Sequence, residues 1–254
     1  LGIMLPYTPL HYLLLEPEIG FPDLLVMTSG NMSDEPIAYQ NDEAEIRINS
    51  IADSFLKHNR QIQMRVDDSV TRIINDGPYI LRRSRGYAPN SFPFPYPNPS
   101  ILATGAELKN TFCLTRENLA FLSHHIGDLE NLETYSAFEE SISHFEKLFR
   151  IDPKIIACDL HPNYLATRYG IARAEKENKK LLLIQHHHAH LAACIAENRP
   201  LLKNPIIGLC FDGTGLGTDQ AIWGGEVLIG DLTQYNRRFH LKYVPLPGGD
   251  ITIR

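Results

Sequence analysis

The sequence has 254 residues, enough to bury one large hydrophobic core or two ordinary ones. It is mildly acidic, with 24 Lys and Arg against 30 Asp and Glu, so a general nucleic-acid-binding surface is not expected. With 43% apolar residues, no apolar run of about 18 residues and no signal-peptide pattern, the composition is typical of a globular protein and argues against membrane insertion and export.

The cysteines are far apart, and each lies in an apolar context: Cys113, Cys158, Cys194 and Cys210. Because no two of them form a CxxC pair, we expect small buried side chains in a reducing, cytoplasmic compartment and no zinc knuckle. The sequence begins with Leu1 rather than Met and ends without a tail-like composition, which suggests part of a longer chain.

The first ninety residues alternate between short apolar runs and polar loops. Residues 23–27 predict a short buried strand, and the small polar loop Thr28-Ser-Gly-Asn-Met-Ser33 follows it. Its hydroxyl groups, amide and glycine suit a phosphate or a carboxylate, but an ordinary turn explains them equally well. Residues 43–57 predict a helix that begins at Asn41 or Asp42 and packs through one apolar face.

Two further strands are expected at residues 62–66 and 79–83. They are joined through Asp67-Asp-Ser-Val70 and a turn at residues 75–78. The second strand runs into Arg82-Arg-Ser-Arg-Gly-Tyr87. Arginines this close together can bind phosphates in a bidentate manner, although a solvated charged face is the simpler explanation.

Residues 88–99 contain five prolines interleaved with Phe and Tyr. Proline at this density excludes a helix and a central strand, so a stiff extended connector is predicted here. We therefore expect one domain at residues 1–90, a proline-rich linker at 91–97 and a second domain at 98–254.

The second domain predicts an α/β order: strands at 101–106, 110–115 and 119–124, helix 134–149, strand 154–159, helix 163–177, strand 180–185, helix 188–198, and strands at 206–211, 221–228 and 238–244. A hairpin-hairpin-helix unit followed by the start of a second copy is the duplicated plan of ribonuclease-H-like, actin-type (ASKHA) folds. Lobe one then spans residues 98–200, and residues 201–254 begin an incomplete lobe two. Ligands of such folds lie between the lobes.

A histidine cluster follows the apolar run at residues 181–184. On a helix, His186 and His190 are four residues apart, so both rings lie on one face about 5–6 Å apart, and one metal ion can join them. His187 and His188 are expected to point elsewhere. A solvated, His-rich helix start is the plainer alternative, but the position directly after a buried strand favours a metal site. No third ligand is visible nearby.

Two turns are expected to face the cleft between the lobes. The first contains Lys109 and Asn110, and the second contains Asp212, Gly213, Thr214, Gly215 and Gly217. Alternate glycines expose backbone N–H groups to a phosphate, and Asp212 at the end of a strand can hold a metal ion or a metal-bound water.

Several short motifs occur in order along the chain: Leu5-Pro-Tyr-Thr-Pro-Leu-His11, Thr28-Ser-Gly-Asn31, Asp67-Asp-Ser-Val70, Arg82-Arg-Ser-Arg-Gly-Tyr87, Gly105-Ala-Glu-Leu-Lys-Asn-Thr111, Ser123-His-His-Ile-Gly-Asp128, Asp159-Leu-His-Pro162, Gln185-His-His-His-Ala-His190 and Phe211-Asp-Gly-Thr-Gly215. Through these motifs the whole sequence strongly resembles the HypF family, the carbamoyltransferases of NiFe-hydrogenase maturation.

The resemblance implies that residues 1–90 are the back half of a YrdC-like domain. There ATP and carbamate, derived from carbamoyl phosphate, would give carbamoyl-adenylate and pyrophosphate. The residues that it places near this nucleotide are Thr28, Ser29, Asn31, Ser69 and Arg82.

The second domain resembles a TsaD-like transferase, which would pass the carbamoyl group from carbamoyl-adenylate to the C-terminal cysteine of HypE. The resemblance implies nucleotide contacts at Lys109, Asn110 and the glycine turn that begins at Asp212. It implies metal ligation by His186 and His190, with Fe, Zn or Mg as the ion. The family's third metal ligand, an acidic residue in the far end of the transferase domain, would lie outside this sequence.

Two classes of function remain open. In the first, His186, His190 and Asp212 are catalytic residues of a carbamoyltransferase, because a cation there can bind an adenylate phosphate or polarise the carbamoyl carbonyl. In the second, the chain is an ATP- and metal-binding ASKHA-type module that changes conformation without group transfer. Carbamoylation of a HypE tail peptide separates the two.

Overall fold

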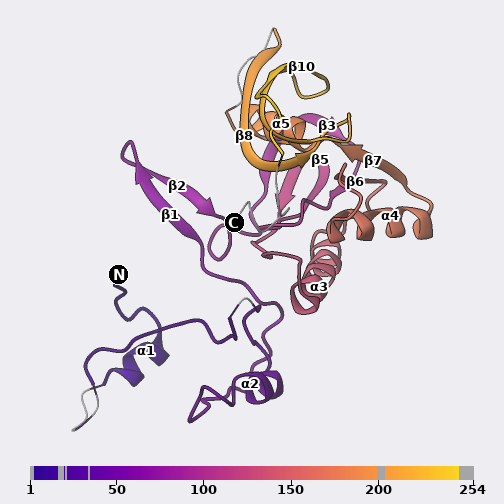
Figure 1. Cartoon of the computed structure of the whole chain (residues 1–254). Helices are drawn as coiled ribbons and strands as arrows, with labels where there is room; N and C mark the ends of the chain where they lie inside the picture. Colours follow the sequence, from indigo (N-terminus) through magenta and orange to yellow (C-terminus); the bar gives the residue numbers. More distant parts are fainter. Residues whose placement is uncertain (1–2, 17–19, 21, 34, 199–203, 246–254) are drawn as a thin grey trace.

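The computed structural model describes residues 3–16, 20, 22–33, 35–198 and 204–245. Within these residues the protein is a mixed α/β structure with a two-stranded, a five-stranded and a three-stranded sheet (Figure 1). The hairpin belongs to the first ninety residues, which are otherwise largely irregular, and the two larger sheets contain the later strands. None of the described helices is long and apolar enough to cross a membrane.

The first seventy residues contain two short helices, α1 (Pro9–Leu14) and α2 (Asn41–Arg47). The buried strand expected at residues 23–27 does not form, and Leu24 and Val26 there are 80% and 89% exposed. A strand needs a neighbouring strand to satisfy its backbone groups, and no described segment pairs with this one.

The helix expected at residues 43–57 begins where predicted but ends early. Ile48 caps α2, with its N–H donating to the carbonyl oxygen of Ala44. Ile51, expected on the packing face, is 66% exposed. Short helices depend on tertiary packing of their apolar face, and no residue of 43–57 is buried.

The hairpin consists of β1 (Val70–Ile74) and β2 (Gly77–Arg82). Its two-residue turn, Asn75-Asp76, has φ angles of 49° and 61°, as a type I′ turn requires. The turn was predicted, but the prediction of a strand at residues 62–66 is wrong. A two-residue turn fixes the register, so the residues directly before it, not residues 62–66, pair with β2.

The five-stranded sheet has the order β3 (Phe92–Asn98), β5 (Cys113–Leu122), β4 (Ile101–Ala103), β6 (Ile155–Asp159) and β7 (Lys180–Ile184). β4, β6 and β7 are parallel, and α3 (Leu132–Phe149) and α4 (Leu165–Glu177) connect β5 to β6 and β6 to β7. The carboxyl ends of the three parallel strands therefore meet at one edge of the sheet, where α/β proteins bind their ligands.

The proline-rich segment is the edge strand of this sheet and not a free linker, which corrects the assignment of residues 91–97. Phe92 and Pro93 lie opposite Ala120 and Leu119 of β5. An edge strand has only one neighbour, so prolines, which lack an N–H group, are tolerated there. The exclusion of a helix and of a central strand was right.

The helices of this part follow the apolar periodicity of the sequence. Asn131 caps α3 by accepting the N–H of Thr134 at 2.8 Å, and the predicted apolar face contributes the fully buried Phe138, Ile142 and Phe145 to the core. The strands expected at residues 110–115 and 119–124 are instead one continuous strand, β5, within which Glu117 adopts a φ of 56°.

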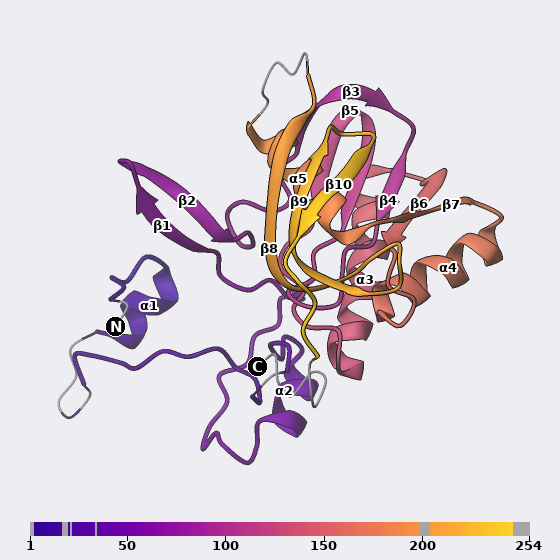
Figure 2. The ribbon, with the colours of Figure 1, turned by 45° about the horizontal axis from the view of Figure 1, so that its top comes forward.

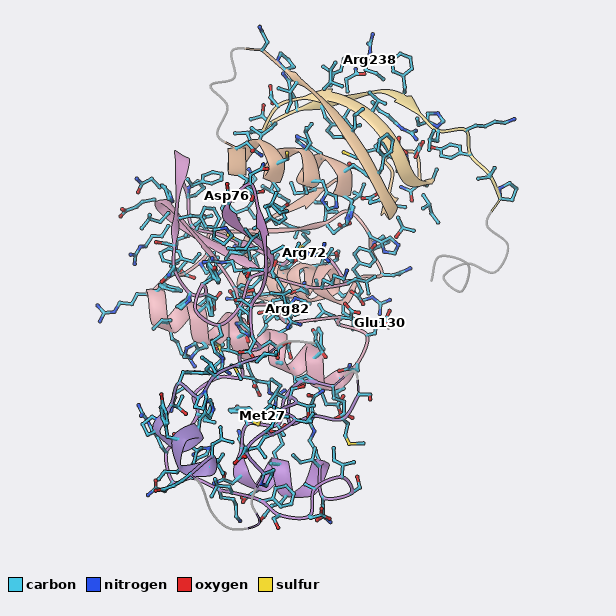
Figure 3. The ribbon with its side chains drawn as sticks, turned by 90° about the vertical axis from the view of Figure 1, so that its left-hand side faces the viewer. Met27, Arg72, Asp76, Arg82, Glu130 and Arg238 are labelled. Atoms are coloured by element: carbon cyan, nitrogen blue, oxygen red, sulfur yellow. The ribbon has the colours of Figure 1, made fainter. Side chains whose placement is uncertain are left out.

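The three-stranded sheet has the order β10 (Tyr235–His240), β9 (Ile222–Gly230) and β8 (Ile206–Leu216), and α5 (His186–Asn198) packs on one of its faces. Figure 2 shows these strands lying over α5. β8 continues through the residues expected to form a glycine turn, with an irregular register between Phe211 and Gly215. In Figure 3, Arg238 of β10 lies at the upper end of the molecule, and Met27 lies in the N-terminal part below the larger sheets.

Candidate metal centre

The strand ends and α5 bring the polar residues of the site together. β6 ends at Asp159, and β7 ends directly before Gln185, after which α5 begins at His186. Cys210 of β8 belongs to the cluster that packs on α5, and this packing carries Asp212, two residues further along, to the first turn of the helix.

Two imidazoles and one carboxylate converge at this point. The Nε2 atoms of His186 and His190 are 3.1 Å apart. Oδ2 of Asp212 lies 3.6 Å from Nε2 of His186 and 3.5 Å from Nε2 of His190. One donor atom from each residue thus lies within 4.8 Å of the others, and Oδ2 is buried without a hydrogen bond to any described residue.

This set of donors fits a divalent cation. Nδ1 of His186 is 2.7 Å from Oδ2 of Asp159, so the proton of the neutral ring lies on Nδ1 and Nε2 presents a lone pair. A histidine held by a carboxylate on its far nitrogen is the usual arrangement at metal sites. Without a cation, the 3.1 Å contact between the two Nε2 atoms makes Nε2 of His190 the donor; with the proton of His190 on Nδ1 instead, both Nε2 atoms and Oδ2 could bind one cation.

The pKa values of the two histidines shift in opposite directions. The hydrogen bond to Asp159 raises the pKa of His186, against the lowering effect of burial. Burial and the neighbouring His186 lower the pKa of His190. As the pH falls, His186 therefore takes up a proton before His190 does. His190 stays neutral down to a lower pH than His186.

His187 does not point away from the site, which corrects one expectation. Its side chain is fully buried, and its Nε2 is 2.7 Å from Oδ1 of Asp212. His188 does turn away, because its Nε2 faces the carbonyl oxygen of Asp231 at 3.0 Å and its ring lies against Tyr235. Helix geometry gives the direction in which a ring leaves the helix, but not what a distant strand places there.

The sequence analysis also missed Asp159 and Gln185, although each is a polar residue at the carboxyl end of a parallel strand, where functional residues collect. Asp212, which the sequence suggested as a residue that can hold a metal ion or a metal-bound water, does place an oxygen beside both histidines. The further acidic ligand that the resemblance places outside this sequence stays a prediction.

Gly213 and Gly215 lie within β8 and not in a free turn, and Gly217 directly follows the strand. A Cβ atom on Gly215 would lie 2.6 Å from Cε1 of His187 and 3.0 Å from Cβ of His186. A Cβ atom on Gly217 would lie 1.9 Å from Nε1 of Trp223. The absence of side chains at these glycines therefore lets this segment approach α5 and β9 closely. The sequence analysis considered only their use in a phosphate-binding turn and did not predict this packing role.

Lys109 and Asn110, in the first of the two predicted turns, form hydrogen bonds within the chain. Asn110 is 1% exposed, and its Nδ2 donates to the carbonyl oxygens of Thr104 at 3.0 Å and Ala106 at 2.6 Å. Lys109 is exposed, and its backbone N–H donates to Asp128 at 2.6 Å. Nucleotide contact by Lys109 and Asn110 stays a prediction.

The residues predicted to contact a nucleotide within the first ninety residues of the chain fall into two groups. Thr28 and Ser29 are exposed, and Nδ2 of Asn31 donates to the carbonyl oxygen of Met32. Ser69 and Arg82 bond to backbone groups at the base of the hairpin. Figure 3 shows Met27, next to the first group, in the N-terminal part and Arg82 at the hairpin, so the described structure keeps the two groups apart.

Three family models match successive parts of the chain. The Sua5, YciO and YrdC family, described as "Telomere recombination", matches residues 1–84. The HypF Kae1-like domain matches residues 96–197, and the second subdomain of the carbamoyltransferase Kae1-like domain matches residues 208–254.

Similar proteins and structures cover the chain almost completely. Carbamoyltransferase HypF of Rhodobacter capsulatus is 45% identical over 98% of this chain and 34% of its own length. The probable carbamoyltransferase HypF of Methanocaldococcus jannaschii is 38% identical over 100% of this chain and 33% of its own length. The crystal structure of full-length HypF in the phosphate- and nucleotide-bound form matches with a TM-score of 0.88 and 47% identity, over 99% of this chain and 32% of that one.

These matches define a mixed α/β protein with a YrdC-type part followed by a Kae1-like domain. The chain belongs to the HypF family, and it spans about a third of the length of the curated relatives that it matches.

Proposed function

We propose that the chain is the part of a HypF-type carbamoyltransferase that contains the transfer site. The observation that supports this most directly is the convergence of His186, His190 and Asp212, in a chain whose relatives are named carbamoyltransferases. The substrate is carbamoyl-adenylate, formed from ATP and from carbamate derived from carbamoyl phosphate. The acceptor is the thiol of the C-terminal cysteine of HypE, and the compartment is the cytoplasm, in keeping with four free cysteines.

His186, His190 and Asp212 hold the divalent ion of this site. Two of the three donors are imidazole nitrogens, which favours zinc or iron over magnesium. When bound, the ion supplies a Lewis acid for the adenylate phosphate or the carbamoyl carbonyl. Asp159 keeps the proton of His186 on Nδ1, so that Nε2 faces the ion.

We assign the nucleotide to two places. In the Kae1-like part it faces Lys109, Asn110 and the segment containing Asp212, Gly213, Thr214, Gly215 and Gly217. In the YrdC-type part it faces Thr28, Ser29, Asn31, Ser69 and Arg82, and the two groups of residues there would have to approach each other around it. The relative solved in a phosphate- and nucleotide-bound form supports nucleotide use by this family. The same proposal includes the duplicated, ASKHA-type plan with its cleft between two lobes. It also includes two domains, with the boundary moved from residue 90 to a position before Arg83 because β3 pairs with β5.

A thiol-acceptor assay tests the proposal. The zinc-loaded chain is mixed with carbamoyl-adenylate and a peptide that ends in the C-terminal cysteine of HypE, and mass spectrometry follows the peptide. We expect a thiocarbamate on the peptide, and none on a peptide with serine in place of the cysteine. The His190→Ala variant is expected to lose this activity, while His188→Ala keeps it. Binding of nucleotide and zinc without any thiocarbamate would instead indicate a binding module.

A further inference from the structure

We propose that Gln185 and His187 orient the carboxylate of Asp212 toward the cation, so that His187 is a positioning residue of the site without being a ligand. The inference rests on the metal centre proposed above. The hydrogen bonds that carry it, however, join residues of this chain, and they can be tested without a metal ion. The argument depends on the direction in which each hydrogen bond is donated.

Two backbone groups fix the orientation of the Gln185 amide. The backbone N–H of His188 donates to Oε1 of Gln185 at 2.9 Å. Nε2 of Gln185 donates to the backbone carbonyl oxygen of Leu216 at 3.3 Å. A backbone N–H only donates and a carbonyl oxygen only accepts, so the amide cannot be flipped end for end without losing both bonds.

The remaining hydrogen on Nε2 of Gln185 determines the tautomer of His187. Nε2 of Gln185 is 3.0 Å from Nδ1 of His187, and because Nε2 donates, Nδ1 must accept. In a neutral imidazole one nitrogen accepts and the other carries the proton, so the proton of His187 lies on its Nε2. Nε2 is 2.7 Å from Oδ1 of Asp212 and donates to it.

This hydrogen bond leaves one oxygen of Asp212 for the cation. Oδ1 accepts from His187, whereas Oδ2 is buried without a hydrogen bond among the described residues and faces Nε2 of His186 and of His190. The His187 ring is tightly held, since a Cβ atom on Gly215 would lie 2.6 Å from its Cε1. Partners behind metal ligands typically contribute about 10–100-fold to metal affinity.

The first experiment determines the tautomer in the metal-free protein. Long-range nitrogen–proton correlation spectra of the 254-residue chain report which nitrogen of His187 carries the proton. We expect a proton on Nε2 and a bare Nδ1. The Gln185→Glu variant keeps the size of the side chain and the acceptor for His188 but removes the donor, so Nδ1 should become protonated. A protonated Nδ1 in the unaltered protein, or a bare Nδ1 in the variant, overturns the proposal.

The second experiment measures zinc affinity by calorimetry in two matched variants. In His187→Gln the amide nitrogen reaches about as far as Nε2 of the ring, so it can still donate to Asp212. In His187→Asn the amide nitrogen ends near the position of Nδ1, so the bond is lost. We expect His187→Asn to lose about 10–100-fold in zinc affinity and His187→Gln to retain most of it.

Thermal melts of the same variants show whether each one is folded. Equal losses of zinc affinity in two folded variants would mean that His187 acts only through packing, and no loss in either would mean that it does not act on the site. If the unaltered protein binds no zinc, the metal centre itself is wrong, and the spectra still decide how His187 and Gln185 are arranged.

Discussion

Replacing His190 with Ala should remove most of the zinc affinity of the protein. His190 supplies one of three converging donors, so its loss should exceed the roughly 10–100-fold effect typical of residues behind the ligands. His188→Ala is the matched control in the same helix, because that ring faces the carbonyl oxygen of Asp231 instead of the site. Calorimetric zinc titration compares the two, and similar losses in both variants would reduce the cluster to a nonspecific His-rich patch.

His124 should make the folded protein sensitive to acid. Its side chain is 4% exposed and its Nδ1 has no hydrogen-bond partner among the described residues. Burial, with smaller effects of His125 and His144, lowers its pKa from 6.5 to about 4. Protons therefore bind the unfolded chain more strongly than the folded one, so this contribution to stability is complete above about pH 6.5 and is lost as the pH falls toward 4.

The expected loss from His124 between pH 7 and pH 5 is about 2 kcal/mol of unfolding free energy. Urea denaturation of the metal-free protein at the two pH values measures it. The His124→Leu variant cannot take up a proton at this position, and its unfolding free energy should fall by about 2 kcal/mol less over the same range. An unchanged pH dependence in the variant would show that His124 is not the cause.

Residues of the candidate site could be suggested from the sequence where the pattern that indicates them lies within one segment of the chain. His186 and His190 follow from helical spacing, and Asp212 from its place after an apolar run. Asp159 and His187 could not be assigned, because their roles depend on which strand end and which helix turn come together in space. Spacing along one helix carries no information about such pairings between distant segments.

At the scale of elements, Gly170 sets how closely α4 packs on β6. A Cβ atom there would lie 2.1 Å from Sγ of Cys158 and 3.2 Å from Cγ2 of Ile156. Gly170→Ala should therefore destabilise the protein by about 1–3 kcal/mol, although alanine is favoured over glycine at an unhindered helix position. In a Cys158→Ala background the cost should shrink, because the clashing sulfur is gone. Urea denaturation of the four proteins tests this, and a stabilising Gly170→Ala would contradict it.

Elements were predictable where a partner surface lies within the same part of the chain. The apolar periodicity of α3 is matched by Leu114 of β5 and by Phe112, which directly precedes that strand, and this helix forms nearly as expected. Residues 23–27 and 48–57 show similar apolar patterns, yet none of them is buried and they stay irregular. A pattern predicts a buried face only if something covers that face.

At the scale of the whole molecule, the proposed metal centre joins two structural units. His186 and His190 begin α5, directly after the five-stranded sheet, and Asp212 lies in the three-stranded sheet. A ligand that binds only the folded state stabilises it, by about 2.7 kcal/mol at a free concentration one hundred times its Kd. Zinc should therefore raise the Tm of the protein, a chelator should reverse the rise, and Asp212→Asn should reduce it strongly. An equal rise in the variant would place the zinc elsewhere.

The boundary between the two parts of the chain should lie before Arg83 and not within the proline-rich segment. The guanidinium of Arg83 donates to the carbonyl oxygens of Tyr87 at 2.8 Å and Asn90 at 2.6 Å, and its own carbonyl oxygen accepts the N–H of His125 at 3.0 Å. These bonds tie the chain after Arg83 to the second part, and β3 then pairs with β5.

Limited digestion with a protease of broad specificity tests this boundary, because cleavage needs chain that can leave its partners. Residues 48–69 are irregular and mostly exposed, so we expect the first cuts there. The products should include a resistant fragment that begins before residue 83 and extends beyond α5, and mass spectrometry identifies its ends. First cuts within residues 92–98 would restore the proline-rich segment as the linker, and first cuts within residues 101–190 would mean that the five-stranded sheet is not the stable unit of the molecule.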